Sequence, residues 1–233
     1  MASINYSDMF IWYVAFLLSA TAHEASHALA AMKGGDLTAY RGGQVTLNPL
    51  PHIKRSPVGT VVVPLITFFL WGWMIGWASA PYDPNWAGKY PRRAACMAVA
   101  GPAANLLIAI VAFILIKVGL AAEVFAAPTS TPITLSTIVL AESGIWSGLA
   151  KFLSVILMLN LILFMFNLFP FPPLDGSSVI TLFMSDAMAI RFRNFISQPA
   201  FSFLGLILAW RFFGLIFKEV FIIIFKLIHP TYL

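Results

Sequence analysis

Residues 9–32 read MFIWYVAFLLSATAHEASHALAAM, an apolar stretch interrupted only by the ionisable side chains of His23, Glu24 and His27. This length exceeds the ~20 residues that a membrane-spanning helix needs. The stretch lacks the basic leading region of a cleaved signal peptide and is too long for one. Ionisable groups are costly inside a membrane and usually mark a functional site. The stretch therefore predicts a membrane helix that carries a chemical function.

The composition agrees with a membrane protein. Of 233 residues, 60% are hydrophobic and only 10% are charged, and the mean hydropathy is +0.88. Soluble domains carry about 25% charged residues, so a soluble globular, a disordered and a nucleic-acid-binding protein are excluded. The net charge of +5 comes from 14 Lys and Arg against 9 Asp and Glu, an excess that we expect to set membrane orientation. The one cysteine, Cys96, excludes an internal disulfide and a cysteine-based metal cage.

Further apolar stretches predict the remaining membrane segments. Three contain no charged residue: Val58–Ala80, Ala94–Ile116 and Phe152–Leu174. Another, Pro199–Ile228, could be a helix in the membrane interface or a spanning helix followed by a surface helix. It carries Arg211, Lys218, Glu219 and Lys226. We expect an all-α polytopic membrane protein with a single domain over residues 1–233, its core at about 9–190 and a C-terminal helical region at about 198–229.

Basic residues are unevenly distributed among the connecting loops. The loop 119–146 contains no Lys or Arg. The other loops are basic: 33–57 with Lys33, Arg41, Lys54 and Arg55, 81–93 with Lys89, Arg92 and Arg93, and 175–198 with Arg191 and Arg193. Because basic loops stay in the cytoplasm, we expect a multi-pass protein of the cell (plasma or inner) membrane with its N-terminus outside. Two successive cytoplasmic loops flank Val58–Ala80, so this stretch should re-enter and leave on its own side.

The cluster His23-Glu24-Ala25-Ser26-His27 has the spacing of a metal site. Residues four apart share one face of a helix, so His23 and His27 can bind one ion. Imidazole nitrogens suit zinc, and Glu24 is placed to hold a water as general base, the arrangement of a metalloprotease. The alternative is a structural polar cluster. The surrounding residues are small, which allows other helices to approach closely.

A catalytic zinc usually has three protein ligands, and the third has several candidates. These are His52, Asp83, Asp175, Asp186 and His229. Asp175 stands out because it follows an apolar stretch and three prolines, at 170, 172 and 173, which forbid a regular helix. Irregular backbone at membrane depth is tolerated only inside protein or beside a water-filled cavity. Alternatively, Asp175 is simply the N-cap of a new helix, and both could hold together.

The chain resembles the site-2 proteases, which are intramembrane zinc metalloproteases. It is expected to be a minimal member of that family, without accessory domains. Three elements carry the resemblance: His23-Glu24-x-x-His27, Gly101-Pro102-Ala103-Ala104-Asn105, and Asn167-x-x-Pro170-x-x-x-x-Asp175-Gly176. It implies that His23, His27 and Asp175 bind the metal and that Glu24 and Asn105 are catalytic. In that scheme Glu24 is the general base, Asn105 positions the scissile carbonyl or stabilises its oxyanion, and Asn167 lies near the substrate. One departure is Lys54-Arg55-Ser56-Pro57, where an acidic residue is expected before the proline.

A re-entrant Val58–Ala80 would also bring Asp175 to the same side of the membrane as His27, as a shared metal site requires. If Val58–Ala80 crossed the membrane, Asp175 would lie across a ~30 Å hydrocarbon core from His27. A helix over 58–71 rises ~21 Å, and an extended return over 73–80 covers ~26 Å. The return, partly strand-like, could pair along its free edge at Gly72–Pro81 with an unwound substrate, which makes Trp73 and Trp77 candidate substrate-binding residues. The alternative is a plain bent packing helix.

These observations predict an intramembrane zinc metalloprotease with one Zn²⁺ per chain and its active site toward the cytoplasm. It would cleave a transmembrane protein or peptide in or near its membrane segment, as in regulated intramembrane proteolysis. The expected surroundings are the lipid bilayer, with no nucleic-acid partner. A membrane metal-binding or metal-carrier protein and a non-catalytic relative are the alternatives. We further expect His52 in a loop, His229 at the surface and Cys96 in the core.

Overall fold

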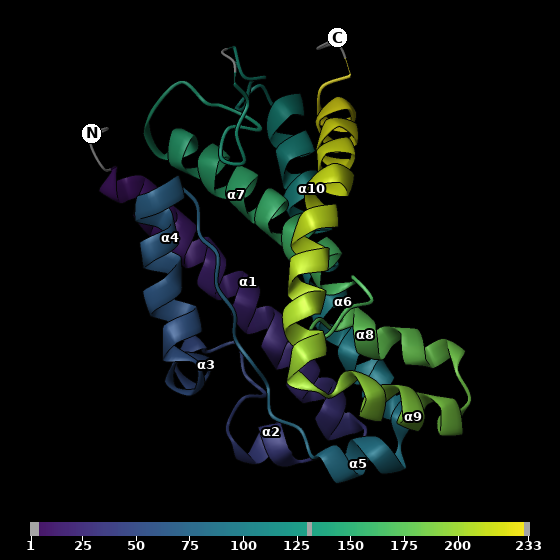
Figure 1. Cartoon of the computed structure of the whole chain (residues 1–233). Coiled ribbons are helices and arrows are strands. Elements are labelled where there is room, and N and C mark those ends of the chain that lie inside the picture. Colours follow the sequence, from purple (N-terminus) through teal and green to yellow (C-terminus); the bar gives the residue numbers. More distant parts are fainter. Residues whose placement is uncertain (1–4, 130–131, 231–233) are drawn as a thin grey trace.

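Three long helices form the centre of the computed structural model, which describes residues 5–129 and 132–230. These helices are α1 (Tyr6–Lys33), α6 (Pro91–Ala121) and α7 (Gly144–Asn167), and each packs against the other two. α1 and α7 run in the same direction and α6 runs in the opposite direction (Figure 1). The described residues form no β-strand beyond one isolated bridge. The all-α class and the three-helix core predicted from the sequence are therefore confirmed.

Small side chains let the core helices approach closely. α1 begins where the Asn5 side chain accepts hydrogen bonds from two backbone N–H groups of the first turn, as an N-cap does. The buried alanines of α1 and α6 allow the two backbones to come near each other; they are Ala15, Ala20, Ala25, Ala28 and Ala31 on α1, and Ala94, Ala95, Ala98, Ala109 and Ala112 on α6. Larger side chains fill the rest of the core, including Phe16, Ile116, Leu157 and Met158.

The segment after α3 (Pro49–Arg55) forms a hairpin of helix and extended chain. A π-helical turn, η1 (Val58–Val62), continues into α4 (Val63–Trp71). The helix ends at Gly72, whose φ of +76° turns the chain back. The return then runs beside α1 towards α5 (Pro84–Lys89) (Figure 1). The helix over 58–71 and the extended return have the hairpin shape predicted for this segment, and its re-entry into the membrane stays a prediction.

Contacts between the two arms show that the hairpin closes on its own starting point. The Oγ atoms of Ser56 and Ser79 lie 3.3 Å apart. The N–H of Trp77 donates to the Gly59 carbonyl at 3.0 Å. A Cβ on Gly59 would lie 2.3 Å from the Trp77 carbonyl oxygen, so only glycine permits this approach. The return is therefore bound to its own helix, and the strand character predicted for it is not found because no neighbouring strand pairs with it.

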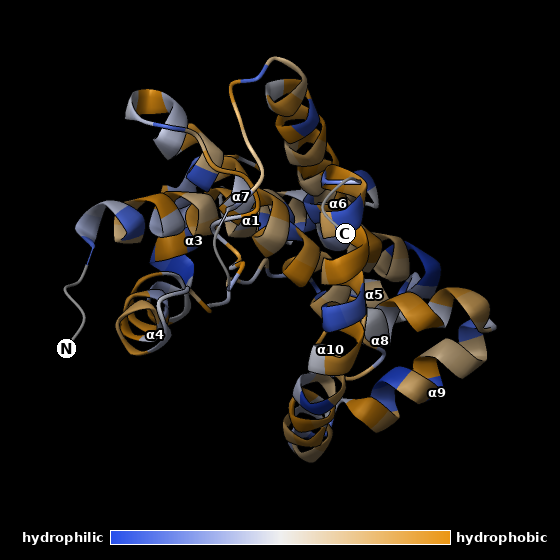
Figure 2. Cartoon of the chain, turned by 90° about the horizontal axis from the view of Figure 1, so that it is seen from above, coloured by the Kyte–Doolittle hydropathy of each residue, from blue (hydrophilic) through white to orange (hydrophobic). Residues whose placement is uncertain are grey.

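Helix length and hydropathy identify the membrane segments. Among the described residues, α6, α7 and α10 (Pro199–Ile228) are long and apolar enough to cross a bilayer, and α3 with Val58–Trp71 is a further bent pair with a 113° bend. α1 is long enough, but His23, Glu24 and His27 reduce its hydropathy. Figure 2 shows hydrophobic residues over α4 and much of α10, and many large apolar side chains face outward. The protein is a polytopic membrane protein.

Short helices gather at one end of the bundle, where α1 ends and α6 begins (Figure 1). They are α2 (Thr38–Arg41), α3, α5, α8 (Gly176–Val179), the 3₁₀ turn η2 (Ile180–Phe183) and α9 (Asp186–Ile196). This end contains the basic loops of the sequence. The loop after α6, which has no Lys or Arg, lies at the opposite end with the end of α10. Here Lys151 forms an ion pair with Asp8 at 2.5 Å.

The C-terminal region is one continuous helix, α10, and not a spanning helix followed by a separate surface helix. It packs on α7 through aromatic rings, with Phe213 5.4 Å from Phe166 between ring centroids. The ammonium of Lys117 donates to the carbonyl of Ile228 at 3.2 Å. α10 therefore completes the fold beside α6 and α7.

Three single-residue expectations were wrong. His229 is 6% exposed and contacts the Ile138 carbonyl at 2.8 Å, because the end of α10 folds against the loop before α7. Cys96 is exposed, because it lies on the outer face of α6. His52 is buried within α3, where Pro49 starts a helix in a stretch that read as a loop. The errors at His229 and Cys96 concern packing between elements, which a single apolar stretch does not specify, whereas the error at His52 concerns a local helix start.

The closed hairpin predicts a disulfide. In a Cys96→Ser background, Ser56→Cys with Ser79→Cys should cross-link nearly completely on mild oxidation, because the two Oγ atoms are already 3.3 Å apart. Ser56→Cys with Trp71→Cys, which joins the base of the hairpin to its tip, is the control and should stay reduced. Mobility on a non-reducing gel after proteolysis between the cysteines measures the bond. Cross-linking of the control pair alone would contradict the hairpin.

Candidate metal centre

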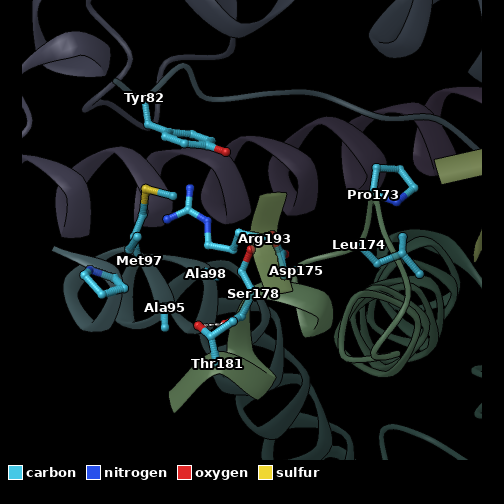
Figure 3. A pocket seen from close by; sticks show the side chains of 12 residues that line it. Tyr82, Ala95, Met97, Ala98, Pro173, Leu174, Asp175, Ser178, Thr181 and Arg193 are labelled. Carbon is cyan, nitrogen blue, oxygen red and sulfur yellow. Dashed lines mark hydrogen bonds between the residues drawn. The ribbon is translucent and has the colours of Figure 1, made fainter. Parts of the chain in front are cut away.

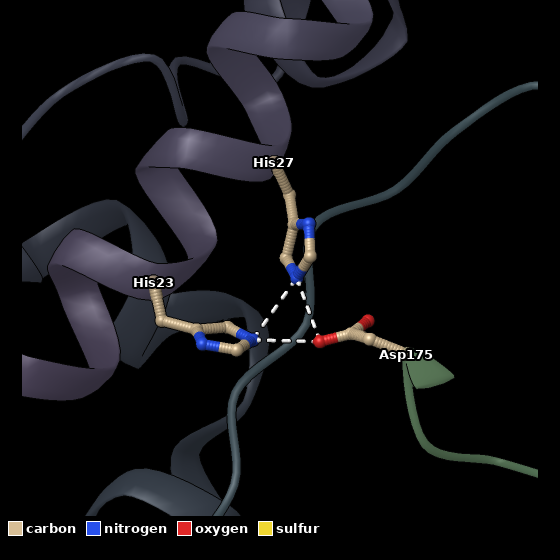
Figure 4. A group of neighbouring side chains, drawn as sticks. All are labelled: His23, His27 and Asp175. Carbon is tan, nitrogen blue, oxygen red and sulfur yellow. Dashed lines mark hydrogen bonds and ion pairs between the residues drawn. The ribbon is translucent and has the colours of Figure 1, made fainter. Parts of the chain in front are cut away.

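Two histidines and an aspartate bring three donor atoms together. His23 and His27 lie one turn apart on α1, with Nε2 atoms separated by 3.0 Å. Asp175 Oδ2 lies 3.1 Å from His23 Nε2 and 3.2 Å from His27 Nε2 (Figure 4). Tetrahedral zinc with bonds of about 2.0–2.1 Å needs ligand atoms about 3.3 Å apart. The donor set therefore fits one zinc ion, with a small outward movement.

The loop after α7 delivers Asp175 to this site. α7 ends at Asn167, and the prolines that follow keep residues 168–175 out of a helix. Gly176 permits the chain to fold back, since a Cβ there would lie 2.3 Å from the carbonyl oxygen of Leu168. Asp175 occupies the N-cap position of α8, but its side chain makes no capping hydrogen bond. Its carboxylate is directed to the histidines instead, so Asp175 holds the N-cap position of α8 without capping the helix through its side chain.

The outer nitrogens of both imidazoles have acceptors. His27 Nδ1 lies 2.7 Å from the Met97 carbonyl. A carbonyl can only accept, so Nδ1 carries the proton and Nε2 is left with the lone pair that a metal requires. His23 Nδ1 lies 2.5 Å from Asn105 Oδ1. Such outer contacts orient metal-binding histidines and fix their tautomer.

A buried hydrogen-bond chain fixes the orientation of Asn105. The Ser19 hydroxyl donates to the Ala15 carbonyl at 2.7 Å, so its oxygen accepts from Asn160 Nδ2 at 2.8 Å. Asn160 Oδ1 then accepts from Asn105 Nδ2 at 2.7 Å. Asn105 must therefore present its oxygen to His23. Ser19, Asn105 and Asn160 are fully buried and come from α1, α6 and α7 respectively.

The position of Gly101 beside the histidines explains why the motif Gly101–Asn105 begins with glycine. A Cβ at this position would lie 2.3 Å from His27 Nε2 and 2.6 Å from His23 Nε2. α6 therefore presents bare backbone to the metal-binding atoms. Any side chain here would clash with both imidazoles.

The remaining predicted residues have defined surroundings. Glu24 is 8% exposed and makes no hydrogen bond with the described residues, which leaves its carboxylate able to accept one. Asn167, the last residue of α7, donates to the Leu163 carbonyl at 2.9 Å. Trp73 packs partly against the core, whereas Trp77 is 54% exposed over the hairpin. The substrate roles expected of Asn167, Trp73 and Trp77 stay predictions.

The other candidate ligands have different partners. Asp83 caps α5, and Asp186 pairs with Arg92 at 3.6 Å. His52 contacts the Thr46 carbonyl, and His229 contacts the loop before α7. Among the described residues, the only potential metal-binding cluster contains His23, His27 and Asp175. Sequence reasoning missed Asn160 and Ser19; polar residues within apolar helices were the available signal.

Comparison with known families agrees with this geometry. The profile described as peptidase family M50 matches residues 11–210. The chain belongs to peptidase family M50. This is the site-2 protease family that the three motifs indicated, and the match includes every residue of the proposed metal centre.

Two curated relatives support the M50 assignment. YwhC of Bacillus subtilis, named as a proposed zinc metalloprotease, is 35% identical over 185 residues, covering 74% of this chain and 73% of the relative. Rip2 of Mycolicibacterium smegmatis, named likewise, is 30% identical over 174 residues, covering 74% of this chain and 57% of the relative. No solved structure matches the chain significantly. This M50 protein is therefore a zinc metallopeptidase with Zn²⁺ as its cofactor.

The hydrogen-bond chain predicts a distant effect on zinc. Asn160→Leu preserves side-chain volume but removes the partner that orients Asn105, so His23 loses its fixed tautomer. Zinc affinity, measured by chelator competition on the folded protein, should fall about tenfold or more. Ser154→Ala, which also removes a buried polar group from α7, is the control and should keep wild-type affinity. Equal zinc affinity in both variants would refute the positioning role of Asn160.

Proposed function

We propose that this protein is an intramembrane protease that hydrolyses a peptide bond in or near a transmembrane segment of a membrane-protein substrate. The observation that carries the proposal is the placement of the donor set His23, His27 and Asp175 inside a bundle of apolar helices. Glu24 is beside it on the same helix. A substrate segment in the bilayer can reach this position by moving laterally, without first leaving the membrane.

In the proposed mechanism, one group of residues binds the metal and Glu24 transfers the proton. His23, His27 and Asp175 would hold the zinc ion, which when bound supplies a Lewis acid for the scissile carbonyl. Glu24 accepts a proton from the attacking water and returns it to the leaving amine. The buried position of Glu24 excludes competing solvent, which strengthens its interaction with the attacking water.

Asn105 has a positioning role in this scheme. Its oxygen faces His23, and its nitrogen faces Asn160 and the Ser19 carbonyl. Contact with a scissile carbonyl, as the resemblance implies, would require this network to open. We therefore assign Asn105 to the orientation of His23 in the resting site, and the catalytic contact remains the alternative for the substrate-bound state.

The return of the hairpin offers an edge for an extended substrate. The N–H groups of Ile75 and Trp77 donate towards the helical arm, to Thr67 Oγ1 at 2.9 Å and to the Gly59 carbonyl at 3.0 Å. In an extended chain successive residues point to opposite sides, so the backbone N–H and C=O of Gly76 point away from the helical arm. A substrate strand could add there beside Trp77, with Asn167 proposed to contact it farther along.

Orientation in the membrane follows from the charge distribution. The basic end of the bundle contains the short helices, and basic loops remain cytoplasmic. The proposal therefore places the metal centre on the cytoplasmic side, the start of α1 outside, and the whole chain in one membrane-embedded domain. Release of a cytoplasmic fragment from such a site is the chemistry of regulated intramembrane proteolysis.

Substitution of the general base separates proteolysis from metal carriage. Glu24→Gln should retain bound zinc but lower cleavage of a model transmembrane substrate at least about 100-fold, because the amide cannot accept the proton. Glu219→Gln, an exposed carboxylate on α10, is the matched control and should cleave normally. Zinc content is measured alongside cleavage in reconstituted protein. Full cleavage by Glu24→Gln would remove Glu24 from the mechanism, and a wild type that binds zinc but cleaves nothing would favour a metal carrier.

Cysteine labelling tests the orientation. In the Cys96→Ser background, an impermeant maleimide should label Trp77→Cys from the cytoplasmic side of membrane vesicles. Glu142→Cys, in the acidic loop at the opposite end, should label only from the outside. The reverse pattern would contradict the proposed sidedness.

A further inference from the structure

A cavity opens beside the metal centre towards the basic end of the bundle. Its volume is about 120 Å³. α6 contributes small side chains, including Ala94, Ala95 and Ala98, and the loop before α8 contributes Asp175 (Figure 3). Ser178, Thr181 and Arg193 add polar groups. Because the cavity shares Asp175 with the metal centre, it borders the proposed site of cleavage.

Arg193 is the cationic group of this cavity, and its charge has no carboxylate partner. The side chain is half-buried, and one guanidinium nitrogen donates to the Ala87 carbonyl at 2.6 Å. The ion pairs within the described residues do not include Arg193. Asp175 lines the same cavity, but its Oδ2 faces both histidines. Because only one guanidinium nitrogen bonds to the protein, the remaining guanidinium donors can bind an anion from outside the chain.

The position of the cavity along α6 gives the distance between the cavity and the metal centre, where the scissile bond would lie. Gly101 faces the metal-binding nitrogens, while Ala94 lines the cavity. Seven residues of helix cover about 10 Å, which an extended peptide covers in about three residues. A substrate side chain in the cavity is therefore within about three residues of the scissile bond, on its cytoplasmic side.

We infer that this cavity is a specificity subsite in which Arg193 binds an acidic side chain of the substrate. The ligand class is an Asp or Glu carboxylate, because the planar guanidinium pairs with carboxylates in a two-bond geometry. The hydroxyl of Ser178 can add a third hydrogen bond. This inference rests on the proposed function, because it names the substrate residue that the protease selects.

A charge exchange tests the subsite. Model transmembrane peptides carry Asp, Asn or Lys at each of the three positions on the cytoplasmic side of a cleavage site mapped by mass spectrometry. The wild type should cleave the Asp peptide at one of these positions with a KM about tenfold below that of the Asn peptide. Arg193→Glu should prefer Lys over Asp. Arg191→Glu, an exposed arginine on the same helix that does not line the cavity, should retain the wild-type preference.

Two further measurements keep the test informative if Arg193→Glu misfolds or if the protein does not cleave the peptides. Arg193→Gln can still donate to the Ala87 carbonyl and should lose only the preference for Asp. Peptide binding is also measured by anisotropy in a Glu24→Gln background, so that selectivity is recorded even if the wild type cleaves nothing. Cleavage without any change of preference in Arg193→Glu and Arg193→Gln would overturn the subsite but leave the protease assignment intact. Selective binding without cleavage would support the subsite and contradict the proposed function.

Discussion

The meeting of His23, His27 and Asp175 inside an apolar bundle is the constraint on which the rest of the structure depends. Asp175 is about 150 positions from the two histidines along the chain, yet its Oδ2 lies 3.1 and 3.2 Å from their Nε2 atoms. Polar groups in such surroundings are costly unless every donor and acceptor has a partner. The contacts of Asn105 with His23 and of the Met97 carbonyl with His27 meet this requirement for the Nδ1 atoms of the two imidazoles. The polar site is thus tolerated because all three core helices contribute to it.

The same constraint determines the topology, and this part could be predicted from the sequence. Asp175 reaches His27 only if the stretch 58–80 returns to its own side, and the distribution of basic loops independently indicates the same path. The hairpin, with Ser56 and Ser79 in contact, agrees with both. The histidine pair could also be predicted, because histidines four apart are a local pattern, whereas Asp175 was one of five candidates for the third ligand and was singled out by the proline-rich break and by the family resemblance. The loop charges and the metal ligands are informative about topology because both constrain which segments, distant in the sequence, lie on the same side of the membrane.

What could not be predicted depends on pairings between helices. Asn160 is one polar residue in a long apolar stretch, and nothing local indicates that Asn105 is its partner. The burial of His229 follows from the contact of α10 with a distant loop. The exposure of Cys96 follows from which face of α6 the other helices cover. Lipid is as apolar as a protein core, so hydropathy alone does not distinguish a lipid-facing side chain from a buried one.

The hairpin and the metal centre are mechanically linked through the end of α1. Asp36, 4% exposed just beyond that helix, accepts hydrogen bonds from the N–H of Thr38 at 2.9 Å and from the N–H of Asp83 at 2.8 Å. Burial alone would raise the pKa of the Asp36 carboxyl, but the hydrogen bond from the Thr38 hydroxyl at 2.6 Å, together with these two N–H groups and the charge of Arg41, holds the pKa below its ordinary value. The carboxylate therefore stays ionised at neutral pH and fixes the end of the return to α1. Because α1 also carries His23 and His27, the substrate-binding edge proposed for the return is attached at this end to the helix that bears both histidines.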